Sequence, residues 1–72
     1  PVTNSIFIER QADESGNFLI ELMDVLGRKL ITTEMNKLSQ KIEINIEAIE
    51  SGNYFIRIYN NNFSIVREII IK

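Results

Sequence analysis

Residues 40–47 read Gln-Lys-Ile-Glu-Ile-Asn-Ile-Glu, and they alternate polar and apolar side chains more regularly than any other stretch of the chain. Successive side chains of a β-strand point to opposite faces of the sheet, so Ile42, Ile44 and Ile46 share one face. The polar residues between them share the other. The pattern predicts a strand that packs one face on a hydrophobic core and exposes the other to water.

Shorter runs of β-branched and aromatic residues lie on both sides of this strand, separated by segments rich in glycine, asparagine and serine. Gly27 predicts a chain reversal, in which Asp24 can accept hydrogen bonds from nearby amides. Residues 35–39 are expected to form a mostly polar connection. We expect five further strands, at Ser5–Glu9, Phe18–Val25, Lys29–Glu34, Tyr54–Tyr59 and Phe63–Ile71.

Six short strands separated by turns are typical of an all-β, antiparallel sandwich, and a small closed barrel is the alternative that the sequence leaves open. Pro1–Thr3 or Ala48–Ile49 would supply a seventh strand. A helix over Asp24–Met35 competes with this interpretation, but Gly27 and the two threonines disfavour it.

The run Phe18–Val25 carries apolar side chains on both of its faces. Phe18, Ile20 and Leu22 fall on one face, and the opposite face is partly apolar as well. A strand of this kind is expected to be central in its sheet or covered on both sides. Phe18 and Tyr54 are the aromatic residues that we expect in the core.

The 72-residue chain has a formal net charge of −2 and contains neither cysteine nor histidine. Its length fits one small domain, 1–72, which must be stabilised by apolar packing because disulfides and Cys/His zinc sites are excluded. Acidic and basic residues are interspersed, so nucleic acid is not an expected partner. The chain has no apolar run of membrane-helix length and no signal peptide at Pro1–Asn4, and is expected to be an excised piece of a longer protein.

The side chains that most enzymes use for acid–base or nucleophilic chemistry are missing or isolated. Histidine and cysteine are absent, and no serine lies in a Gly-x-Ser-x-Gly turn. Asp13 and Glu14 are too few to surround a calcium ion, which takes about six or more oxygen ligands. Arg28 and Lys29 can hold an anion, although such a pair more often forms a solvated turn. We therefore expect no enzyme, cofactor or metal site.

Residues 23–30 read Met-Asp-Val-Leu-Gly-Arg-Lys-Leu, and residues 49–58 read Ile-Glu-Ser-Gly-Asn-Tyr-Phe-Ile-Arg-Ile. In this order, and followed by a polar turn, an apolar strand and a lysine, they resemble the C-terminal sorting domain of the type IX secretion system. The family's corresponding segments are aromatic-Asp-x-x-Gly-Arg/Lys-x-Val and Leu-Pro-x-Gly-x-Tyr-Phe-Val-x-Val, so the aromatic residue and the proline differ here. Pro1–Thr3 resembles the end of the family's Asn-Pro-Val entry motif. The motif residues carried over are Asp24, Gly27, Arg28, Gly52 and Tyr54.

The resemblance implies an immunoglobulin-like antiparallel β-sandwich of six to seven strands that serves as an address label. In this family of Bacteroidota proteins, the cargo crosses the inner membrane with a signal peptide and folds in the periplasm. The outer-membrane translocon and its shuttle proteins then recognise the sorting domain. A sortase-like peptidase removes it, upstream of Pro1 in this case, and the cargo is released or anchored at the cell surface.

The last strand is the candidate recognition element, because an edge strand can pair with a strand of another protein. We expect Ile69, Ile70, Ile71 and Lys72 to carry it, since three successive isoleucines place apolar groups on both faces. The alternative for Ile70 is that it covers a hydrophobic patch within the domain. Pairing of an edge between two copies would give a homodimer. The alternative function is a structural or carbohydrate-binding module of a surface protein; the end of the chain on a strand at Lys72 favours the sorting domain.

Overall fold

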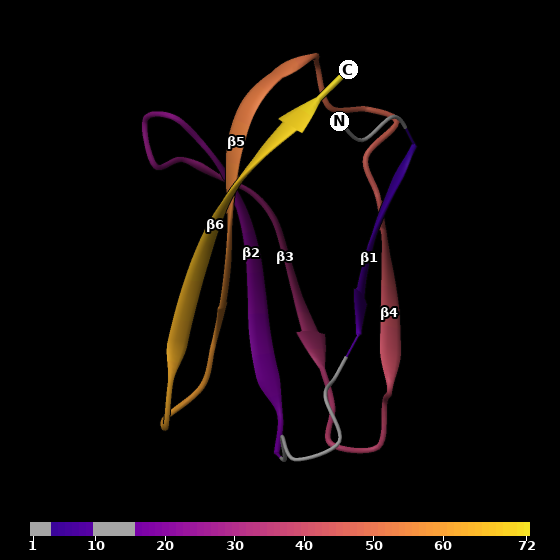
Figure 1. The fold of residues 1–72 in the computed structure, drawn as a ribbon, viewed down its shortest axis with the longest axis vertical. Coiled ribbons are helices and arrows are strands. Elements are labelled where there is room, and N and C mark those ends of the chain that lie inside the picture. Colours follow the sequence, from indigo (N-terminus) through magenta and orange to yellow (C-terminus); the bar gives the residue numbers. More distant parts are fainter. Residues whose placement is uncertain (1–3, 10–15) are drawn as a thin grey trace.

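The computed structural model describes residues 4–9 and 16–72 and places them in six strands that form two antiparallel sheets (Figure 1). This part of the chain contains no helix, and so none that is long and apolar enough to cross a membrane. The strands are β1 (Ser5–Glu9), β2 (Phe18–Asp24), β3 (Lys29–Met35), β4 (Lys41–Asn45), β5 (Gly52–Tyr59) and β6 (Ser64–Ile71).

A four-stranded sheet in the order β3-β2-β5-β6 lies against a two-stranded sheet of β1 and β4. Every pairing is antiparallel, and the two separate sheets make the fold a sandwich and not a closed barrel. β2 is central, with Ile20 opposite Thr33 on β3 and opposite Ile58 on β5. The prediction of an all-β, immunoglobulin-like sandwich is confirmed, as is the central position of the strand that begins at Phe18.

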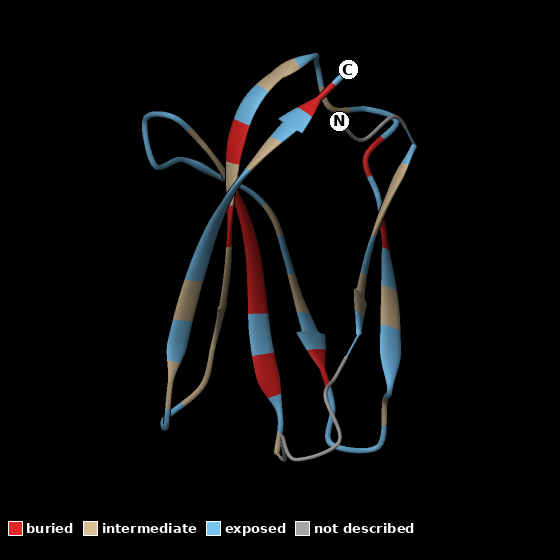
Figure 2. Cartoon of the chain, viewed as in Figure 1, coloured by how far each residue is buried: buried red, intermediate tan, exposed pale blue. Residues whose placement is uncertain are grey.

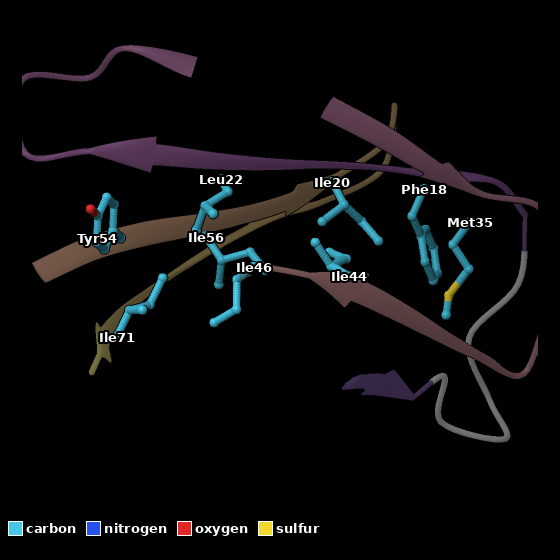
Figure 3. Packing of buried hydrophobic residues seen from close by; sticks show 9 residues of the cluster. All are labelled: Phe18, Ile20, Leu22, Met35, Ile44, Ile46, Tyr54, Ile56 and Ile71. Atoms are coloured by element: carbon cyan, nitrogen blue, oxygen red, sulfur yellow. The ribbon is translucent and has the colours of Figure 1, made fainter. Parts of the chain in front are cut away.

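The buried residues come from strands of both sheets (Figure 2), and together they form one hydrophobic core. β2 contributes side chains that are at most 2% exposed, and Ile44 on β4 and Ile46 directly after β4 approach them (Figure 3). The alternation in the sequence therefore predicted the buried face correctly for β2 and for the segment that contains β4. The predicted burial of both aromatic residues is also confirmed. The buried apolar residues are Phe18, Ile20, Leu22, Met35, Ile44, Ile46, Tyr54, Ile56 and Ile71.

One expectation about a connecting segment was wrong, and one of the two alternatives for a seventh strand is not formed. Met35 does not begin a polar connection; it ends β3, pairs with Phe18 and is 1% exposed. The antiparallel register extends β3 by one residue, and that residue falls on the inward face. Ala48–Ile49 forms a turn and not a seventh strand, closed by a 2.9 Å hydrogen bond from the Ile49 amide to the Ile46 carbonyl. The other candidate for a seventh strand, Pro1–Thr3, lies outside the described residues.

Candidate functional site

Three segments that are distant in the sequence meet at one end of the sandwich. The β2–β3 turn, the start of β5 and the end of β6 all lie toward the upper end of the view in Figure 1. In the four-stranded sheet, Tyr54 lies opposite Asp24 on β2 and opposite Ile69 on β6, and Gly52 lies opposite Ile71. This motif end, made of residues 24–28, 50–54 and 69–72, unites the two motifs and the last strand that the sequence singled out.

Asp24 organises the β2–β3 turn through its carboxylate. Its Oδ1 atom accepts hydrogen bonds from the backbone amides of Leu26 and Arg28, both at 2.9 Å. Its Oδ2 atom accepts a 2.6 Å hydrogen bond from Nε of Arg28. The backbone adds two bonds, from the Gly27 amide to the Asp24 carbonyl and from the Asp24 amide to the Arg28 carbonyl. The predicted role of Asp24 as an acceptor for turn amides is confirmed.

The same contacts favour the ionised form of the Asp24 carboxyl group. The hydrogen bond from the Arg28 amide is the main reason that the pKa of Asp24 lies below its ordinary value of 3.8, and the Arg28 side chain lowers it further. Gly27 has a φ of +82°, in the left-handed region that side chains resist. Apart from Gly27 and its two chain neighbours, no described residue has an atom within 4 Å of where a Cβ would be. The backbone angle, and not a shortage of space, therefore favours glycine.

Tyr54 anchors the beginning of β5. Its hydroxyl donates a 2.6 Å hydrogen bond to the backbone carbonyl of Glu50, four residues earlier, while its ring packs in the core. This arrangement resembles the tyrosine corner of immunoglobulin-like sandwiches. Gly52, between the two residues, has a φ of +155°, and a Cβ on it would lie 3.6 Å from the Tyr54 ring. The hydrogen bond and the ring packing of Tyr54 give the second motif a clear part in holding the fold together.

The four residues at the end of the last strand differ sharply in burial. Ile71 is 2% exposed in the core, and Ile69 packs against the core. Ile70 points to the outer face of the sheet, where it is 51% exposed, and Lys72 is exposed beyond the strand. Loss of the whole segment would therefore remove core contacts together with surface groups. Only Ile70 and Lys72 offer side chains to a partner without a change in the core.

A buried carboxylate on the outer face of the sheet was missed by sequence reasoning. Glu21 is 2% exposed, and its Oε2 atom lies 3.1 Å from Nζ of Lys29 and accepts a 3.0 Å hydrogen bond from the Tyr59 hydroxyl. Its Oε1 atom is 3.8 Å from Nη1 of Arg57 and accepts no hydrogen bond within the described part of the chain. The guanidinium of Arg57 in turn lies 3.9 Å from the centre of the Tyr59 ring.

The Lys29 hydrogen bond is the main reason that the pKa of Glu21 is lowered, against the opposing effect of burial. Tyr59 and Arg57 act in the same direction as Lys29. A sequence signal for this cluster did exist. An acidic residue stood in the middle of an apolar strand, and Arg57 and Tyr59 shared the corresponding face of another strand. What the sequence did not contain was the register that sets Glu21 opposite Arg57.

A shallow hollow separates the β2–β3 turn from the β4–β5 connection at the motif end. Several of its polar groups are already engaged with one another, since Asp24 binds Arg28 and the Tyr54 hydroxyl binds the Glu50 carbonyl. Within residues 4–9 and 16–72, no cluster of three or more acidic side chains is placed to hold a metal ion. Asp13 and Glu14 lie outside these residues. The hollow is lined by Asp24, Arg28, Leu30, Ala48, Ile49, Glu50 and Tyr54.

Comparison with known proteins identifies the family of the chain. The model of the secretion system C-terminal sorting domain family matches residues 1–72, which is the whole chain. No curated protein and no solved structure matches it. The chain therefore belongs to the C-terminal sorting domain family of the type IX secretion system. Its family function is that of a sorting signal, which acts with the type IX machinery to direct export to the outer membrane, the cell surface or the medium.

Proposed function

We propose that residues 1–72 act as one non-catalytic recognition domain, which the type IX translocon and its shuttle proteins bind in the periplasm of a Bacteroidota cell. Binding uses the end of β6, at Ile69–Lys72. A sortase-like peptidase afterwards removes the domain, and the cargo is released or anchored at the cell surface.

The observation that carries this proposal is the position of Ile70. It is half-exposed on the outer face of a strand at the edge of the four-stranded sheet. A large apolar side chain in that position contributes little to the core, but it would be buried by a partner that adds a strand to the edge. Ile69 and Ile71 support this role indirectly, because their inward side chains fix the strand in place. Lys72 adds a positive charge directly after the strand.

An edge strand must also avoid uncontrolled pairing with other strands. Arg67 lies on the inward row of β6, opposite Ile56, and its side chain is nevertheless exposed. An inward-pointing charge in an edge strand discourages aggregation. The part of β6 beyond Glu68 carries only isoleucines up to its end at Ile71. The charge at Arg67 therefore discourages pairing along the first part of β6, and the isoleucines after Glu68 leave its end open to a specific partner.

An export assay with matched substitutions tests the proposal. A fluorescent cargo that carries an inner-membrane signal peptide is fused ahead of residues 1–72 and expressed in a bacterium with type IX machinery. Ile70→Ser is compared with Val66→Ser, because Val66 lies on the same face of the same strand and is 49% exposed. Export of the unsubstituted and Val66→Ser fusions, with retention of Ile70→Ser in the periplasm, is expected.

Thermal denaturation of each isolated domain serves as the folding control. Both substitutions change half-exposed side chains, so the two variants should melt at similar temperatures. Equal export of all three fusions would show that the end of β6 is not the recognition element. Retention of the unsubstituted fusion would contradict the sorting role itself and favour a structural or carbohydrate-binding module.

A further inference from the structure

The β2–β3 turn carries two large apolar side chains at its tip. Val25 is 63% exposed and Leu26 is 75% exposed, although tight turns are usually occupied by glycine, asparagine, aspartate, serine or proline. Neither residue belongs to the hydrophobic core or to the partly buried shell around it. The fold therefore gives no reason for apolar residues at these two positions.

The turn that presents them is held by a dense set of hydrogen bonds. Asp24 binds the Leu26 amide, the Arg28 amide and the Arg28 side chain, and two backbone bonds close the same turn. The amide of Leu26 is thus fixed in position while its side chain projects into water. A rigid segment loses little conformational entropy when it binds a partner. A turn built in this way is suited to insert its tip into a preformed pocket.

The chemistry next to the tip indicates the kind of pocket. Leu30, which is 43% exposed, adds apolar surface beside the turn. The Arg28 side chain is 73% exposed and uses its Nε group to bind Asp24. A guanidinium has about five N–H donors in total, so Arg28 can still donate to a further carboxylate. The neighbouring Lys29 is paired with the buried Glu21.

We propose that Val25 and Leu26 form a second docking element, which inserts into an apolar pocket of a protein of the secretion machinery with a carboxylate on its rim for Arg28. The inference rests on the proposed sorting function and adds a contact that is separate from the side chain of Ile70. Both elements belong to the motif end, so one partner can touch them together.

A protein pocket explains the turn better than a lipid surface does. Stable membrane attachment needs two signals, such as two lipid chains or one lipid chain with a cluster of basic residues. Two aliphatic side chains and one available cation provide much less affinity for a membrane than this. The chain also has a net charge of −2, which weakens attraction to anionic lipids. The ordered backbone, in contrast, gives shape specificity that only a complementary protein surface would use.

The export assay described above tests the inference with a substitution at the tip. Leu26→Ser is compared with Leu38→Ser, because Leu38 is an 82% exposed leucine in the β3–β4 turn at the opposite end of the sandwich. Removal of an apolar side chain from a buried contact weakens binding about tenfold or more. We expect the exported fraction to fall about tenfold for Leu26→Ser and to stay unchanged for Leu38→Ser. Leu26→Met, which keeps an apolar side chain of similar size, should restore export.

Val25→Thr gives a second test that preserves the shape of the side chain. Val25→Thr should also reduce export. If Leu26→Ser lowers the melting temperature of the isolated domain, the export of the Val25→Thr fusion decides whether the inference holds. Normal export of a folded Leu26→Ser variant together with normal export of Val25→Thr would overturn the inference and leave the sorting function intact. An equal loss for Leu26→Ser and Leu38→Ser would overturn it as well. Retention of the unsubstituted fusion would instead remove the sorting function, and the inference with it.

Flotation of the isolated domain with vesicles of phosphatidylethanolamine and phosphatidylglycerol separates the two kinds of partner. We expect the domain to remain unbound. Flotation that depends on Leu26 would show that the turn binds lipid, and the proposed protein pocket would then be wrong.

Discussion

Replacement of Glu21 by glutamine is expected to destabilise the domain at neutral pH while it preserves the shape of the side chain. A hydrogen bond to a charged group contributes about 1.5–3 kcal/mol, and the Lys29 contact at 3.1 Å is of this kind. The Lys29 side chain is 61% exposed, so solvent screening reduces its share. The Tyr59 hydroxyl can still donate to the glutamine oxygen. We therefore expect the free energy of unfolding to fall by about 1–2 kcal/mol at pH 7.

The effect should depend on pH in a defined direction. The pKa of Glu21 in the folded protein lies below its ordinary value of 4.5, because Lys29, Tyr59 and Arg57 favour the ionised form. A lowered pKa means that the carboxylate stabilises the fold above the ordinary value and loses this contribution as the pH falls through the folded-state pKa. Glutamine does not titrate. The stability difference between the original protein and Glu21→Gln should therefore be largest near neutral pH and should shrink in acid.

Urea denaturation followed by far-ultraviolet circular dichroism, at pH 7 and at about pH 2.5, measures this difference. Glu34→Gln is the matched control, since Glu34 is an exposed glutamate on the outer face of the neighbouring strand. Its effect should stay within about 0.5 kcal/mol at both pH values. A loss of stability for Glu21→Gln that is the same at pH 7 and in acid would refute the electrostatic explanation. No loss at either pH would show that the buried carboxylate does not stabilise the fold.

Three further substitutions test the contacts assigned to the motif end. Ile71→Ala should reduce the free energy of unfolding by about 2–4 kcal/mol, because the side chain is 2% exposed. This loss is a large part of the total free energy of unfolding, which is expected to be roughly 4–10 kcal/mol for a domain of this size. Ile70→Ala should reduce the free energy of unfolding by about 1 kcal/mol or less, because the side chain is half-exposed. Equal losses in urea denaturation would contradict the assigned orientation of β6. Tyr54→Phe removes the hydroxyl that binds the Glu50 carbonyl and should cost about 1 kcal/mol by the same measurement; an unchanged midpoint would show that this hydrogen bond contributes nothing.

Local pattern was enough to predict most of the strands. The alternation at Ile42, Ile44 and Ile46 gave the correct inward face, because alternate side chains of a regular strand share one face and the apolar face packs on the core. The turn at Asp24 and Gly27 could likewise be predicted from the sequence, since its hydrogen bonds join residues that are close in sequence. Met35 was misjudged because its burial depends on its pairing with Phe18, 17 residues away in the sequence, and on the packing of the other sheet.

The candidate site could be predicted only in part for the same reason. The two motifs and the last strand were recognised as separate segments of sequence, and their meeting at one end follows from the pairing of β2, β5 and β6. The burial of Ile71 and the exposure of Ile70 follow from which face of β6 the second sheet covers. The Glu21 cluster depends on strands that are adjacent in the sheet but far apart along the chain.

The sequence by itself determined the all-β antiparallel class, most of the places where the chain turns and the family, because these depend on residue type and short spacing. The tertiary structure alone decided which of the three isoleucines at the end of the last strand is exposed, which glutamate is buried and which apolar residues remain exposed on the β2–β3 turn. The physical reason is that burial is a property of pairs of surfaces. A side chain becomes buried only when a distant strand, brought in by long-range register, covers it.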